Sequence, residues 1–132
     1  MKIEVGEYIN FFYERGQEAP VIGMGDRAFF REDALEGLAL LERLRVPVPS
    51  GGVYKLSDGK VDIAYAWWST KLDDYDEYED FLEESYKETL RYINMFKDSP
   101  ECRYLFEFNL PFSFHGPEDN VEFESWLSRF ES

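Results

Sequence analysis

Apolar residues recur at helical spacing in two segments of the first third of the chain. Residues 3–15 follow this spacing in part and predict a short helix, although Gly6 weakens the pattern. A second helix is predicted from Arg31, because its first turn is acidic and its last turn basic, as the helix dipole favours. Residues 16–30 contain glycines and a proline and predict an ordered connector. The second helix should bury a stripe made of Leu35, Leu38, Leu41 and Leu44.

The middle of the chain reads as a β-hairpin. Pro47 and Pro49 end the second helix, and two apolar segments at 53–56 and 61–69 then flank an Asp-Gly pair, which suits a tight turn. Alternation gives the second arm an apolar face and a mixed face, since successive strand residues point in opposite directions. At least one of the adjacent Trp67 and Trp68 should therefore face away from the core. The apolar face comprises Val61, Ile63, Tyr65 and Trp67, and the mixed face Asp62, Ala64, Ala66 and Trp68.

A long helix, a strand and a short helix are predicted to follow. The long helix runs over 75–97 behind the acidic Asp73 and Asp74, and it stops before a Ser-Pro pair. A strand is expected over 103–110, and a terminal amphipathic helix over 121–130. The long helix should bury Tyr78, Phe81, Leu82, Tyr86, Thr89, Leu90, Ile93 and Phe96, and the strand should group Tyr104, Phe106 and Phe108 on one face.

This order of elements predicts an α+β fold. We expect a small, mostly antiparallel sheet of three or more strands, packed by about four helices, in a single domain over 1–132. An apolar core of this size should fold without a metal, as a monomer or a weak homodimer.

Composition and charge narrow the function. Hydrophobic residues make up 44% of the chain and aromatic residues 18%, which excludes a disordered protein. With 28 acidic against 14 basic residues the net charge is −14, which disfavours nucleic acid and anionic membranes and favours a basic protein partner. One cysteine, no secretory leader and no long apolar segment together predict a cytoplasmic protein.

The sequence offers little for catalysis. The only histidine, His115, lies in a predicted loop, and Cys102 lacks the basic surroundings that activate a thiol. The acidic segment lacks the glycine and ligand spacing of a calcium loop, and the glycine pairs match no nucleotide-binding motif. We therefore expect no catalytic residue, metal or cofactor.

The acidic segment over 73–84 is the strongest candidate for a binding site. On a helix, Asp73, Glu77 and Asp80 would line one solvent face together with Glu84. Such a face is either an ordinary solvated helix start or a docking surface for a basic partner. Aromatic residues beside the charge favour docking, because interface hot spots are rich in tryptophan and tyrosine. The predicted partner-binding residues are Trp67, Trp68, Asp73, Asp74, Tyr75, Asp76, Glu77 and Asp80.

Several short segments resemble the immunity protein 40 family of bacterial polymorphic toxin systems. They extend over roughly residues 20–110 and are structural in type. They are Ile22-Gly23-Met24-Gly25-Asp26-Arg27-Ala28-Phe29, Arg31-Glu32-Asp33-Ala34-Leu35-Glu36, Val46-Pro47-Val48, Gly51-Gly52-Val53-Tyr54, Tyr65-Ala66-Trp67-Trp68, Asp80-Phe81-Leu82-Glu83-Glu84-Ser85 and Tyr92-Ile93.

The resemblance implies a small, non-catalytic cytosolic protein that binds a cognate toxin domain and blocks it. Acidity suits this role if the toxin is nuclease-like, because such a toxin carries a basic surface for phosphate. A generic acidic interaction or regulatory module of a bacterial cytosol is the alternative. A small hydrolase that uses His115 is a more distant one.

Overall fold

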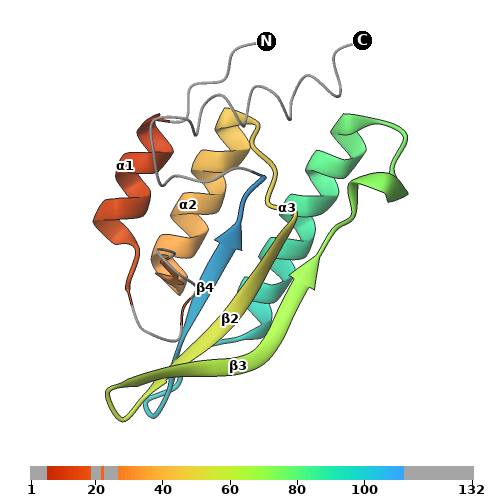
Figure 1. The fold of residues 1–132 in the computed structure, drawn as a ribbon. Coiled ribbons are helices and arrows are strands. Elements are labelled where there is room, and N and C mark those ends of the chain that lie inside the picture. The colour runs from red at the N-terminus through yellow and green to blue at the C-terminus, as the bar shows by residue number, and fades with distance from the viewer. Residues whose placement is uncertain (1–5, 19–21, 23–26, 112–132) are drawn as a thin grey trace.

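The computed structural model describes residues 6–18, 22 and 27–111 (Figure 1). Three α-helices, four strands and one short 3-10 helix occur in this part of the chain. The α+β fold is confirmed, and the fourth predicted helix, over 121–130, lies outside the described residues, as does His115. The elements are α1 (Gly6–Arg15), β1 (Phe29–Phe30), α2 (Arg31–Leu44), β2 (Ser50–Ser57), β3 (Lys60–Ser69), η1 (Leu72–Asp74), α3 (Tyr78–Met95) and β4 (Arg103–Asn109).

The sheet is antiparallel, with the strand order β1-β4-β2-β3. It has one strand more than the three that the sequence pattern located. The additional strand, β1, is only two residues long and pairs Phe29 and Phe30 with the middle of β4. It lies at the end of the glycine-rich connector, where no alternation long enough to signal a strand can develop.

The predicted hairpin is confirmed. Asp58 and Gly59 adopt φ angles of 54° and 75°, the left-handed conformation that a two-residue hairpin turn requires. β2 and β3 pair on both sides of an irregularity between Val53 and Tyr54. The extra residues on β3 form a β-bulge around Tyr65, which has a φ of 55°.

All three helices lie on one face of the sheet (Figure 1), and the main core fills the space between the two layers. Phe106 and Phe108 of β4 meet Val53 and Trp68 there, together with Tyr8 and Phe12 of α1 and several residues of α2 and α3. The predicted grouping of Phe106 and Phe108 is thus confirmed, and Tyr104 packs against the same core. A smaller cluster around Ile22, Ala28 and Leu105 also includes Tyr54, Leu56 and Val61.

A buried chain of hydrogen bonds joins α3 to the sheet. The indole N–H of Trp68 donates to Oγ1 of Thr89 over 2.9 Å, and Thr89 donates in turn to the carbonyl of Ser85. Ser85 Oγ accepts the backbone N–H of Val48 and donates to the carbonyl of Leu82. Each polar side-chain atom in this hydrogen-bond network has a partner, as is usual for buried polar groups.

Two tyrosines of α3 hold the C-terminal end of α2. Tyr86 donates its hydroxyl to the carbonyls of Leu41 and Val46, and Tyr78 donates to the carbonyl of Arg45. Burial raises the pKa of Tyr78 to about 12, although the charge of Arg45 opposes the shift. Burial likewise raises the pKa of Tyr86 above its ordinary value. Both phenols therefore stay protonated as donors.

The predicted bounds of the helices need small corrections. α1 is described over Gly6–Arg15, and residues 3–5 of its predicted range lie outside the described residues; α3 runs over Tyr78–Met95 where 75–97 was expected. α2 buries Leu38 and Leu41 as predicted, but Leu35 and Leu44 are only partly buried. Leu90, predicted to be buried, is exposed because α3 turns that position away from the sheet.

Candidate protein-binding surface

The acidic segment is not a continuous helical face, so that prediction is wrong. Asp73 and Asp74 form the short helix η1, and Asp76 lies in the turn that follows. Glu77 is extended and precedes the first residue of α3, which leaves only Asp80 and Glu84 of the predicted face on that helix. The backbone turns twice here because Asp74 and Tyr75 donate their N–H groups to Lys71 and Leu72, which closes a separate turn.

Tyr75 packs the acidic turn, residues 73–77, against the core. Its ring lies 6.2 Å from the ring of Phe81 between centroids, and its side chain is half-buried. Desolvation raises the pKa of Tyr75 above its ordinary value, and the carboxylates of Glu84, Asp74 and Glu88 add to the shift. Acids of η1 and of α3 thus both act on this phenol, although they do not share one helix face.

The two adjacent tryptophans separate as predicted. Trp67 is 70% exposed, whereas Trp68 is 2% exposed and packs against Tyr92 and Phe108. Trp68 is therefore a core residue, and its inclusion among the partner-binding residues is wrong. Trp67 lies on the opposite face of β3, directly across the ladder from Gly52.

Trp67 is one of three large apolar residues of β3 that are exposed. Ile63 is 42% exposed and Tyr65 is 83% exposed, so three large apolar side chains of one strand face solvent. Alternation did place Ile63, Tyr65 and Trp67 on one face, but nothing in the sequence marked that face as the open one. Tyr65 also carries a left-handed backbone that a bulky residue rarely adopts, and such strained positions are concentrated at functional sites. We call Ile63, Tyr65 and Trp67 the β3 aromatic cluster.

A shallow hollow of about 250 Å³ lies beside this cluster on the sheet. Gly52 leaves room in it, because a Cβ added there would find its nearest described neighbours at 3.8 Å and 3.9 Å. Glu107 is 7% exposed, and its Oε1 accepts a hydrogen bond of 3.1 Å from the Tyr54 hydroxyl. Glu107 is the one acidic residue among the described residues that line the hollow. The lining comprises Gly51, Gly52, Val53, Tyr54, Ile63, Ala66, Trp67, Glu107 and Asn109.

Among the described strands, β3 lies at one edge of the sheet. An open edge invites pairing with another strand, and proteins block such edges with bulges and with local polar caps. β3 has both devices: the bulge at Tyr65 interrupts the ladder, and Asp62 Oδ1 accepts the backbone N–H of Ile63 at 2.8 Å. A partner would therefore contact side chains here more readily than it would add a strand.

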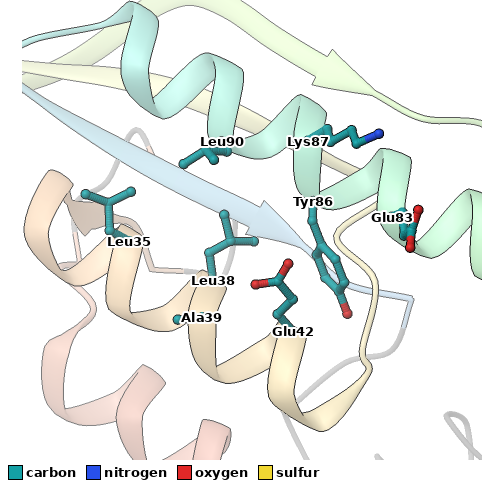
Figure 2. A pocket seen from close by; sticks show the side chains of 8 residues that line it. All are labelled: Leu35, Leu38, Ala39, Glu42, Glu83, Tyr86, Lys87 and Leu90. Atoms are coloured by element: carbon teal, nitrogen blue, oxygen red, sulfur yellow. The ribbon is translucent and has the colours of Figure 1, made fainter.

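A second hollow lies between α2 and α3 (Figure 2) and measures about 490 Å³. Leu35 and Leu38 point from α2 toward α3, and Tyr86 points from α3 toward α2. Glu42, Glu83 and Lys87 lie at its rim, with Leu90 at one end. The hydroxyl of Tyr86 already donates to the backbone carbonyls of Leu41 and Val46.

A third hollow, between α1 and α2, is polar and crossed by ion pairs. Arg43 meets Glu7 at 2.7 Å, and Arg15 meets Asp33 at 2.9 Å. These ion pairs join the two helices, so the charged groups of this hollow are largely paired with each other.

The described residues contain no group of three or more histidine, cysteine, aspartate or glutamate side chains placed to hold a metal ion. No helix in the described part of the chain is long and apolar enough to cross a membrane.

Exposed aromatic side chains beside a carboxylate on an otherwise ordinary α+β scaffold are typical of a protein-binding module. Residues 20–110 match the family model described as immunity protein 40, and the chain belongs to this family. The family implies an immunity protein with a toxin as its partner, and immunity proteins are in general non-catalytic. No curated protein and no solved structure matches the chain.

Proposed function

We propose that this protein binds a cognate bacterial toxin domain in the cytoplasm and neutralises it without catalysis. The observation that carries the proposal is the β3 aromatic cluster, in which Trp67 and Tyr65 are 70% and 83% exposed on an edge strand. Leaving such side chains in water is unfavourable, and large aromatic residues supply most of the binding free energy in many interfaces.

The acidic turn would form a second part of the interface. The five predicted carboxylates of this turn and of the start of α3 are all exposed, and they contribute to the chain's net charge of −14. They are Asp73, Asp74, Asp76, Glu77 and Asp80. This charge would steer a basic toxin toward the surface, while the aromatic side chains would hold it. In the described part of the chain, the other exposed large apolar residues are Tyr13, Leu90 and Met95, which lie on the helices and form no group of three within one element.

The test is protection and binding with the toxin domain encoded next to this gene. Trp67→Ala should abolish protection of cells that express the toxin and should speed dissociation of the purified complex. Leu90→Ala removes an exposed apolar side chain from the α2–α3 groove and serves as the matched control. Loss of protection by Leu90→Ala alone, or a neighbouring gene that encodes no toxin, would contradict the proposal.

The absence of catalysis has its own test. The double variant Cys102→Ala, His115→Ala should protect cells as well as the unaltered protein does, because the proposed interface uses neither side chain. Loss of protection by a variant that still folds would point to a chemical step.

A further inference from the structure

We propose that Tyr65 is the residue of the β3 aromatic cluster that inactivates the toxin, because its ring fills the active-site cleft of an enzymatic toxin and excludes the substrate. This inference rests on the proposed function and names the partner surface that the cluster fits. Ile63 and Trp67 would contact the rim of the cleft. They would supply affinity, whereas Tyr65 would block the reaction.

Tyr65 is more open to solvent than its neighbours on β3. It is 83% exposed, against 42% for Ile63 and 70% for Trp67, and no other large apolar residue in the described part of the chain is as exposed. A concave partner surface can cover both faces of such a ring, and the gain in free energy grows with the apolar area that is buried. Concave sites of this kind are few on a protein and usually bind substrates or other ligands.

The backbone conformation of Tyr65 is not explained by packing of its ring within the protein. Consecutive residues of β2 pair with Ala66 and Ile63, so the two residues between these, 64 and 65, have no partner on β2. Tyr65 has a φ of 55°, which glycine adopts freely and which is unfavourable for a residue with a Cβ. Because the ring is exposed, its burial does little to offset this strain in the free protein. A strained and exposed residue of this kind points to a role in a complex.

The bulge that carries Tyr65 is fixed at both ends. Before it, Asp62 Oδ1 accepts the backbone N–H of Ile63 over 2.8 Å. After it, Trp68 is buried in the core and donates its indole N–H to Thr89. A tyrosine has only two side-chain torsions, and a backbone that is already held in place loses little freedom on binding. Tyr65 is therefore presented to a partner in a preformed conformation.

The chemistry of the cluster also suits a cleft. Ile63 and Trp67 are uncharged, and Tyr65 combines an apolar ring with a hydroxyl that both donates and accepts hydrogen bonds. Active-site clefts are lined mostly by apolar groups with a few polar ones, which is the complementary pattern. The competing possibility is a broad contact away from the active site, in which all three side chains of the cluster supply affinity alone.

The experiment separates binding from inactivation. The toxin domain encoded next to this gene is fused to the full chain through a flexible Gly/Ser linker, and growth of cells that express the fusion is measured. Such a linker raises the effective concentration to about the millimolar range, so a variant with moderately reduced affinity stays bound. Cells with the unaltered chain or with Trp67→Ala in the fusion should grow. Tyr65→Gly in the fusion should arrest growth, because the complex forms but the cleft stays open.

Three controls accompany the fusion. The toxin with the linker alone should arrest growth, which shows that the fused toxin is active. Tyr65→Phe keeps the ring and should allow growth. Tyr65→Gly removes the ring without leaving a strained backbone, and as a separate purified chain it should bind the toxin about tenfold more weakly. Growth of cells with Tyr65→Gly in the fusion would overturn the inference, as would growth arrest by the Trp67→Ala fusion as well.

The separate chains then distinguish failure of this inference from failure of the proposed function. If Trp67→Ala weakens toxin binding and the Tyr65→Gly fusion allows growth, the proposed function stands and the role of Tyr65 is wrong. If neither substitution changes toxin binding by the separate chains, both are wrong.

Discussion

Trp68 and Thr89 are joined by a buried hydrogen bond of 2.9 Å between the indole N–H and Oγ1. Thr89→Val keeps the shape of the side chain but leaves the indole N–H without its acceptor, so the free energy of unfolding should fall by about 1–3 kcal/mol. Urea denaturation measures the loss. In the Trp68→Phe background the same substitution should cost much less, and equal costs in the two backgrounds would contradict the pairing.

Gly51 and Gly52 are neighbours on β2 with opposite tolerance for a side chain. A Cβ at Gly51 would overlap the ring of Trp68 and the carbonyl oxygen of Glu107, whereas a Cβ at Gly52 meets only ordinary contacts. Gly51→Ala should therefore destabilise the protein by about 3 kcal/mol or more. Gly52→Ala should stabilise it by about 0.5–1 kcal/mol, because glycine is unfavourable within a strand. Melting temperatures that shift equally in the two variants would contradict this assignment of faces.

The contrast between these glycines shows what the sequence could predict. Alternation along the second hairpin arm placed Trp67 and Trp68 on opposite faces, because the period of a strand is a local property. Which face the helices would cover depends on tertiary packing, so the open side of the β3 aromatic cluster could not be read from the chain. The hollow beside Trp67 could not be predicted for the same reason, since Glu107 and Gly52 meet only when β4 pairs with β2.

The sequence pattern predicts the long periodic elements well and misses the short ones. α3 and the hairpin carry enough repeats to fix their type, although their ends moved by a few residues. β1 and η1 are two and three residues long, too short for any period to appear. The acidic run looked like a helix start because carboxylates favour that position, yet the separate turn at η1 interrupts it.

Tyr65 holds a left-handed backbone at the bulge, with a φ of 55°. For a residue with a Cβ this conformation costs about 1–2 kcal/mol, and glycine avoids the cost. Tyr65→Gly should therefore be more stable than Tyr65→Ala by about 1 kcal/mol, as measured by urea denaturation. Both variants remove the ring and should bind the toxin more weakly. A Gly variant less stable than the Ala variant would show that the bulge is not strained.

Tyr78 predicts how stability changes in alkaline solution. Its pKa of about 12 in the folded protein exceeds the ordinary value of 10.0, mainly because of burial. The folded state thus favours the neutral phenol, so this contribution to stability is complete below pH 10 and is lost as the pH rises toward 12. Tyr78→Phe should make the decline over this window shallower in urea denaturation at a series of pH values. Parallel curves for the two proteins would contradict the shift.

The acidic turn and the β3 aromatic cluster should affect different steps of toxin binding. Asp76→Lys with Asp80→Lys reverses two exposed charges, so association should slow and its dependence on salt should flatten. Trp67→Ala should instead speed dissociation, by about 30-fold if the ring is a central anchor. Stopped-flow or surface-plasmon kinetics at about 50 and about 300 mM salt separate the two effects. These concentrations lie on either side of about 0.1 M, where the Debye length is about 10 Å.

Net charge alone could also slow association, and Glu101→Lys controls for it. Glu101 is exposed and lies beside Ser57, near the hairpin turn, while η1 follows the opposite end of β3. A docking role for the acidic turn requires that reversal at Asp76 slows association more than reversal at Glu101 does, because screening confines a local charge to its surroundings. If reversal at Asp76 and reversal at Glu101 slow association equally, the acidic turn is only a solvated helix start. The β3 aromatic cluster would then be the binding surface without it.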